Sequence, residues 1–157
     1  MKTAPVTPEA KHIFIQVNTD NIIALRESGM SDKDFEAAVL EHIIIYDQGS
    51  MALGSPIVDF AIAVDSVQDV YFTILPIKLF SYHKVCLTGF NVEKSTGINI
   101  PACKWDPGVL SFKVNTGNVA ENGSLVFSLV ARIDYIRGGL AKNIPINIDP
   151  VMRVRQR

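Results

Sequence analysis

The sequence predicts a mainly β protein: an antiparallel two-sheet β-sandwich, jelly-roll-like, with one short helix. The first observation is strict period-two alternation through Ser124–Ile136, which is typical of a half-buried strand. One face of that segment is apolar throughout: Leu125, Phe127, Leu129, Ala131, Ile133 and Tyr135. The second observation is the return of short apolar runs between turn-forming residues at sandwich-like intervals. The third is that strands and helices do not alternate, which argues against a parallel α/β sheet.

About eight strands are expected from these runs. They fall at residues 11–17, 43–46, 57–64, 70–76, 84–92, 109–114, 124–136 and 144–155. The last segment contains Pro145 and Pro150, so it is predicted to lie at a sheet edge, where a missing N–H is tolerated.

The single helix is predicted at Ser31–Ile43. Ser31 can cap its N-terminus, and acidic residues follow in the first turns, where the helix dipole favours them. Phe35 and Val39 then repeat at helical spacing and form an apolar stripe. Just upstream, Asn18–Asp20 is interpreted as a turn that ends the first strand.

One domain is expected. Residues 1–10 are interpreted as a flexible N-terminal lead-in and residues 11–157 as a single β-sandwich domain. The N-terminus has no signal-peptide core, and no apolar run is long enough to span a membrane, so a cytoplasmic protein is expected. Cys86 and Cys103 are then expected to be free thiols, although a disulfide between them stays open on sequence grounds.

The balance of charge argues against nucleic acid and anionic membranes as partners. The formal net charge is −1 and the isoelectric point is near 6.3. Hydrophobic residues make up 48% of the chain and its mean hydropathy is +0.22. Apolar surface that another subunit covers would account for this composition. A net charge near zero also gives little electrostatic repulsion between copies of the chain. We therefore expect a homo-oligomer, a dimer or larger.

No catalytic, metal or cofactor motif is found in the sequence. The three histidines, His12, His42 and His83, lack metal-ligand spacing, and phosphate-binding and nucleophile-elbow patterns are missing. His83 and Cys86 lie three apart on a predicted strand, so their side chains would point to opposite faces. No enzyme activity, cofactor or metal is expected.

One loop has the composition of a ligand-binding surface. Trp105, the only tryptophan, stands beside Asp106, and a Trp–Asp pair can stack on a sugar ring and hydrogen-bond to it. With Asn115 and Asn118 from the next loop, it forms a speculative glycan or small-ligand site. The competing interpretation, which we favour, is that Trp105 folds back to plug the end of the sandwich.

Two segments resemble the AidA/PixA family of bacterial inclusion body proteins. They are Ile13–Ala24 (IFIQVNTDNIIA) and Asn147–Val154 (NIDPVMRV). In the first, Asn18 stands where the family usually has Asp; the second keeps Asp149 and Pro150. The resemblance implies a cytoplasmic β-sandwich of proteobacteria, abundant enough in some members to form inclusions and linked in some to quorum-regulated, host-associated behaviour. It carries no catalytic residue onto this chain.

The second face of Ser124–Ile136 becomes more polar toward its C-terminal end. Val126 and Val130 are predicted to be covered, either by the helix or by a neighbouring subunit. Arg132 and Asp134 are predicted to be solvated.

Overall fold

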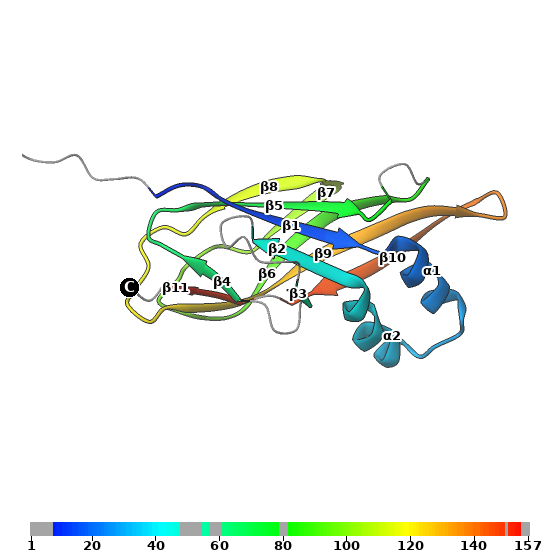
Figure 1. The fold of residues 1–157 in the computed structure, drawn as a ribbon, viewed down its shortest axis with the longest axis horizontal. Coiled ribbons are helices and arrows are strands. Elements are labelled where there is room, and N and C mark those ends of the chain that lie inside the picture. Colours follow the sequence, from blue (N-terminus) through cyan, green and yellow to red (C-terminus); the bar gives the residue numbers. More distant parts are fainter. Residues whose placement is uncertain (1–7, 48–54, 57–60, 79–81, 150, 155–157) are drawn as a thin grey trace, which may run out of the picture.

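Two β-sheets stack face to face in the computed structural model, with the helices gathered at one end (Figure 1). The structure describes residues 8–47, 55–56, 61–78, 82–149 and 151–154. The strands are β1 (Lys11–Val17), β2 (Ile43–Asp47), β3 (Ser55–Pro56), β4 (Ala61–Val64), β5 (Asp69–Pro76), β6 (Lys84–Thr96), β7 (Cys103–Val109), β8 (Ser111–Asn115), β9 (Ser124–Arg137), β10 (Leu140–Ile148) and β11 (Val151–Val154). The helices are α1 (Thr19–Glu27), α2 (Asp32–Val39) and the 3-10 turn η1 (Leu40–His42).

The predicted class, a mainly β two-sheet sandwich, is confirmed, and most strand pairs are antiparallel. One sheet has the order β3-β2-β1-β5-β8, and the other has β4-β11-β9-β6-β7 with β10 also paired to β9. Two pairs are parallel, β1 with β5 and β11 with β4, which sequence patterning did not anticipate. A parallel pair needs a long crossover, and the crossover from β1 to β5 contains both helices.

The core lies between the sheets and is centred on three phenylalanines. Phe72 of β5 comes from one sheet, while Phe90 of β6 and Phe127 of β9 come from the other. The Phe127 ring lies 5.7 Å from Phe72 and 4.8 Å from Phe90, measured between centroids. All three side chains are fully buried. The apolar face predicted for β9 is buried along its whole length, so this long strand is confirmed.

A bulge in β6 keeps its apolar residues facing the core. The pairing of β6 with β9 and β7 shifts register between Leu87 and Gly89, so Leu87 and Phe90 both point inward despite their odd spacing. A Cβ on Gly89 would lie 3.4 Å from the Cys103 carbonyl oxygen and 3.7 Å from the Val130 side chain. A Cβ at position 89 would therefore make ordinary van der Waals contacts with β7 and β9.

Two helices are present where one was predicted. Asn18 is the N-cap of α1, and its side chain accepts a hydrogen bond from the Asn21 backbone N–H at 3.2 Å. The first strand ends just before Asn18–Asp20, as predicted, but Thr19 and Asp20 begin a helix rather than form a turn. Ser31 caps α2 as predicted, accepting from the Asp34 N–H at 3.2 Å. The helix ends at Val39, because the β-branched run that starts at Ile43 extends as β2.

Other predicted boundaries moved by a few residues. The predicted 109–114 strand is β8, whereas β7 forms where a loop was expected, and the 144–155 segment is β10 and β11. Within the predicted strand at 57–64 only residues 61–64 are described, as β4, and residues 1–7 of the lead-in lie outside the described chain.

The outward face of β9 follows its predicted gradient in part. Val126 and Val130 are half-buried, whereas Ser128 between them is only 4% exposed. The side chains of Arg132 and Asp134 are 35% and 39% exposed. On this face Ser128 is therefore buried more deeply than either of the two valines.

Candidate functional site

Trp105 lies on strand β7 rather than in the predicted loop. Its ring packs on Phe112 of β8 at a centroid distance of 4.2 Å, and its side chain is half-buried against the core. Asp106, the next residue, is exposed. The indole packs inward, as the plug interpretation expected, but it does so from a strand and joins the edge strands of the two sheets.

The two asparagines belong to the turn after β8. Asn115 donates a hydrogen bond from its amide to Asp69 at 2.8 Å and accepts one from the Gly117 backbone N–H at 2.9 Å, so its side chain holds the turn. Asn118, three residues after Asn115, is exposed in the same turn region. Trp105 contacts Phe112 near the start of β8, whereas Asn115 ends that strand.

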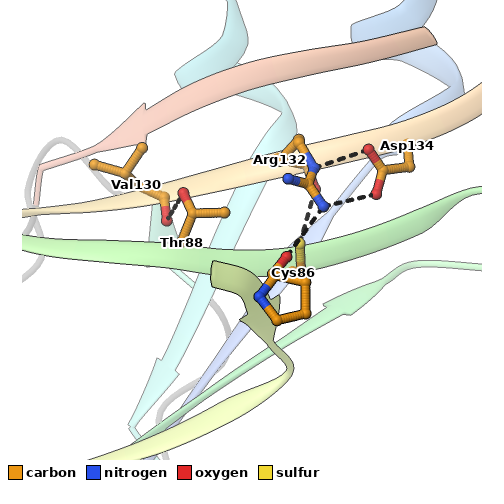
Figure 2. Close-up of polar contacts among 6 residues, drawn as sticks. Cys86, Thr88, Val130, Arg132 and Asp134 are labelled. Atoms are coloured by element: carbon orange, nitrogen blue, oxygen red, sulfur yellow. Dashed lines mark hydrogen bonds and ion pairs between the residues drawn. The ribbon is translucent and has the colours of Figure 1, made fainter. Parts of the chain in front are cut away.

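An arginine–carboxylate pair lies on the outward face of β9 (Figure 2). Arg132 donates to both carboxylate oxygens of Asp134, at 2.9 and 3.2 Å, and to the Pro107 carbonyl at 3.2 Å. The hydrogen bond that Arg132 donates to Asp134 raises the pKa of Arg132. On this face Arg132 therefore ties β9 to β7, a structural role.

Both cysteines are free and half-buried, which answers the disulfide question that the sequence left open. Burial raises the pKa of the Cys86 and Cys103 thiols, so both stay protonated at neutral pH and are weak nucleophiles. Gly108 packs against Cys86: a Cβ there would lie 2.8 Å from the sulfur.

A second polar cluster fastens the start of α1. Thr19 Oγ1 lies 2.9 Å from His83 Nδ1, and Asp20 lies 3.4 Å from the same nitrogen. Lys78 pairs with Asp20 at 2.7 Å and, through that hydrogen bond, lowers the pKa of this exposed carboxyl. The His83 ring also meets Tyr135 edge-on. These contacts join α1 to β6 and β9.

A cleft of about 360 Å³ lies beside α2. Its wall on the sheet side comes from β6, β9 and β10. The described lining residues are Phe35, Glu36, Val39, Leu40, Asn91, Glu93, Ser128, Pro145, Ile146, Asn147 and Asp149. Desolvation raises the pKa of Asp149, and repulsion from Glu93 and then Glu36 adds to the shift.

Large exposed apolar side chains gather at the far end of the β6–β9 pair. Lys84 pairs with Asp134, so Tyr82 and Ile136, two residues further in each direction, extend past the same end of the ladder. They are 98% and 72% exposed. Leu140 follows the turn of the β9–β10 hairpin, which projects beyond the other strands in Figure 1, and is also exposed.

Comparison with known proteins finds similarity in three-dimensional structure only. No family model and no curated protein matches the sequence. A crystal structure of the inclusion body protein PixA from Burkholderia cenocepacia J2315 superposes with a TM-score of 0.64, covering 99% of this chain and 100% of that chain. This chain has the PixA fold. Sequence identity to PixA is 7%, so the likeness concerns the fold alone.

In the described part of the chain, no helix is long and apolar enough to cross a membrane.

The cleft beside α2 was not identified from the sequence, because its carboxylates, those of Glu36, Glu93 and Asp149, are far apart in the chain. One signal was available: after Ser124, which begins β9, Ser128 interrupts an otherwise apolar run from Leu125 to Ala131.

Proposed function

We propose that this chain is a non-enzymatic, self-associating cytoplasmic protein of the inclusion-body type, and a distant member of the AidA/PixA family. The observation that carries the proposal is the likeness to the PixA inclusion body protein across essentially the whole of both chains. The resemblance of Ile13–Ala24 and Asn147–Val154 to the same family supports it from the sequence side. These two lines of argument are independent, because at 7% identity a superposition draws little on sequence.

Self-association is further supported by the surface and by the charge. Tyr82, Ile136 and Leu140 expose large apolar side chains at one end of the sandwich. A net charge of −1 gives little repulsion between copies. We therefore place the contact between copies at the end that carries Tyr82 and the β9–β10 hairpin, with a second copy of this chain as its partner.

Light scattering coupled to size exclusion, over a range of concentrations, tests the proposal. The molar mass of the wild-type chain should rise with concentration, and the double variant Tyr82→Ser, Ile136→Lys should shift the dissociation constant by about tenfold or more. The control is Val67→Lys, which changes a 51% exposed valine in the β4–β5 turn and should leave the mass curve unchanged.

A chain that stays monomeric at high concentration would contradict the proposal. Equal weakening by the control and by the double variant would contradict the assignment of the surface, because the effect would then follow from added charge in general.

A further inference from the structure

The cleft beside α2 brings together three carboxylates from three elements. Glu36 comes from α2, Glu93 from β6, and Asp149 from the end of β10. The described residues that line the cleft include no lysine, arginine or histidine. Repulsion from Glu93 and Glu36 adds to the desolvation that raises the pKa of Asp149, so both glutamates act on this carboxyl. A bound cation would relieve this repulsion.

The three carboxylates are nevertheless spread along the cleft. Within the described ranges, no three acidic, histidine or cysteine side chains lie close enough together to hold a metal ion. A single small cation therefore does not contact all three charges. A ligand with several positive charges at a distance from one another does match such an arrangement.

An unpartnered hydroxyl at the floor of the cleft is an independent sign of a ligand. Ser128 is 4% exposed, lines the cleft, and lies on the strand face opposite the core residues Phe127 and Leu129. Its hydroxyl has no hydrogen-bond partner among the described residues. Such a group is unfavourable in a protein interior unless something bonds to it.

Strand pairing shows what surrounds that hydroxyl. Ser128 pairs with Asn91 across β6. On its other side Ile148 pairs with Leu129, and continuing that register by one residue brings Asp149 opposite Ser128. The Ser128 hydroxyl thus lies between the Asn91 amide and the Asp149 carboxylate, and the oxygens of all three groups can accept a hydrogen bond from an N–H donor.

The remaining wall is apolar. Phe35 and Val39 of α2 and Ile146 of β10 are buried core residues that also border the cleft, and Pro145 lies beside them. Such a wall favours methylene groups between the charges of a ligand.

We propose that this cleft binds an aliphatic polyamine, an organic cation whose ammonium groups are separated by short methylene segments. The ammonium groups meet Glu36, Glu93 and Asp149, one N–H is accepted by the Ser128 hydroxyl, and the methylene segments lie on the apolar wall. This site lies away from the Tyr82 end of the molecule and does not depend on self-association.

Isothermal titration of the full-length chain with spermidine at low ionic strength tests the proposal. Saturable binding of one spermidine per chain is expected, with putrescine weaker and n-butylamine weaker still, because each has fewer charges. Glu36→Gln, Glu93→Gln and Asp149→Asn should each weaken spermidine binding by about 2- to 5-fold. Glu121→Gln, which removes an exposed carboxylate outside the cleft, is the matched control and should leave affinity unchanged.

Ser128→Ala separates a binding role from a structural one. It should weaken spermidine while the melting temperature of the ligand-free chain stays equal or rises, since a buried hydroxyl without a partner is removed. Unsaturable binding, equal affinity for spermidine and n-butylamine, or carboxylate variants that match Glu121→Gln would overturn the proposal. Displacement of spermidine by equimolar Ca²⁺ or Mg²⁺ would overturn it in favour of a metal site.

Discussion

Replacing Trp105 with alanine distinguishes a structural plug from a sugar-stacking platform. The indole packs on Phe112 at a centroid distance of 4.2 Å, and Phe112 in turn stacks on Phe72 of the central core at 5.2 Å. Trp105 is thus the outermost ring of an aromatic series that begins between the two sheets. Its removal opens space at the edge of the core.

The expected loss follows from the burial of the side chain. Truncating a fully buried Phe or Trp to alanine destabilises a protein by about 3–5 kcal/mol. Trp105 is half-buried, so about half of that value, ~2 kcal/mol, is expected. For a chain of this length, that free energy corresponds to a fall in melting temperature of about 4–8 °C. Trp105→Phe keeps a ring against Phe112 and should lose less than about 1.5 kcal/mol.

Urea unfolding followed by circular dichroism measures these losses, because the alanine and phenylalanine variants lack the only tryptophan and therefore have no tryptophan fluorescence. A glycan array run on the same proteins should show no binding that depends on Trp105. A loss under about 0.5 kcal/mol, the range of ordinary surface substitutions, together with abolished glycan binding would refute the plug and restore the ligand site with Asp106.

Three further predictions concern stability. Asp47→Ala should lower the free energy of unfolding by about 3–5 kcal/mol in a urea titration. The ammonium of Lys11 lies 2.8 Å from the Asp47 carboxylate and its side chain is 6% exposed, so the variant leaves a buried charge without this carboxylate. A loss below about 1 kcal/mol would contradict this prediction. Gly108→Ala should lower the free energy of unfolding by about 1–3 kcal/mol, because φ is +115° and the new Cβ would clash with the Cys86 sulfur. Adding Cys86→Ala should recover only the part of the loss that comes from this clash. Full recovery would show that the backbone at position 108 is not strained. Asp149→Asn should raise stability at neutral pH by a few tenths of a kcal/mol, since a carboxyl with a raised pKa favours unfolding when ionised. That gain should vanish as the pH falls below about 4, where the carboxyl is protonated in both states, and a gain that persists there would exclude an electrostatic cause.

Local patterns in the sequence were sufficient for the strand content and for one helix. The alternation in Ser124–Ile136 predicted β9 and its buried face, because a side-chain period of two is a property of the strand itself. The Ser31 cap predicted the start of α2 for the same reason: the cap and its N–H partner are three residues apart. Helix α1 was missed because Asn18 favours turns and N-caps alike, and the apolar pair Ile22–Ile23 that α1 buries is too short to display a helical period.

Other features depend on residues that are distant in the chain. The parallel pairing of β1 with β5 joins Lys11–Val17 to strand residues nearly 60 positions later, and no local pattern encodes the direction of such a pair. The role of Trp105 was open because a loop platform and a plug have the same sequence, and only Phe112, from the neighbouring strand, shows where the indole packs.

By itself the sequence determined that this is a β-sandwich, which faces of its strands are buried, and where α2 begins, because these follow from the spacing of neighbouring side chains. Only the tertiary structure decided that Glu36, Glu93 and Asp149 share a cleft and that a buried Ser128 hydroxyl lies at its floor. Those groups meet through strand pairing and the packing of α2, interactions between segments that the order of residues does not specify. The same holds for the apolar end at Tyr82 and Ile136, whose adjacency follows from the register of β6 on β9.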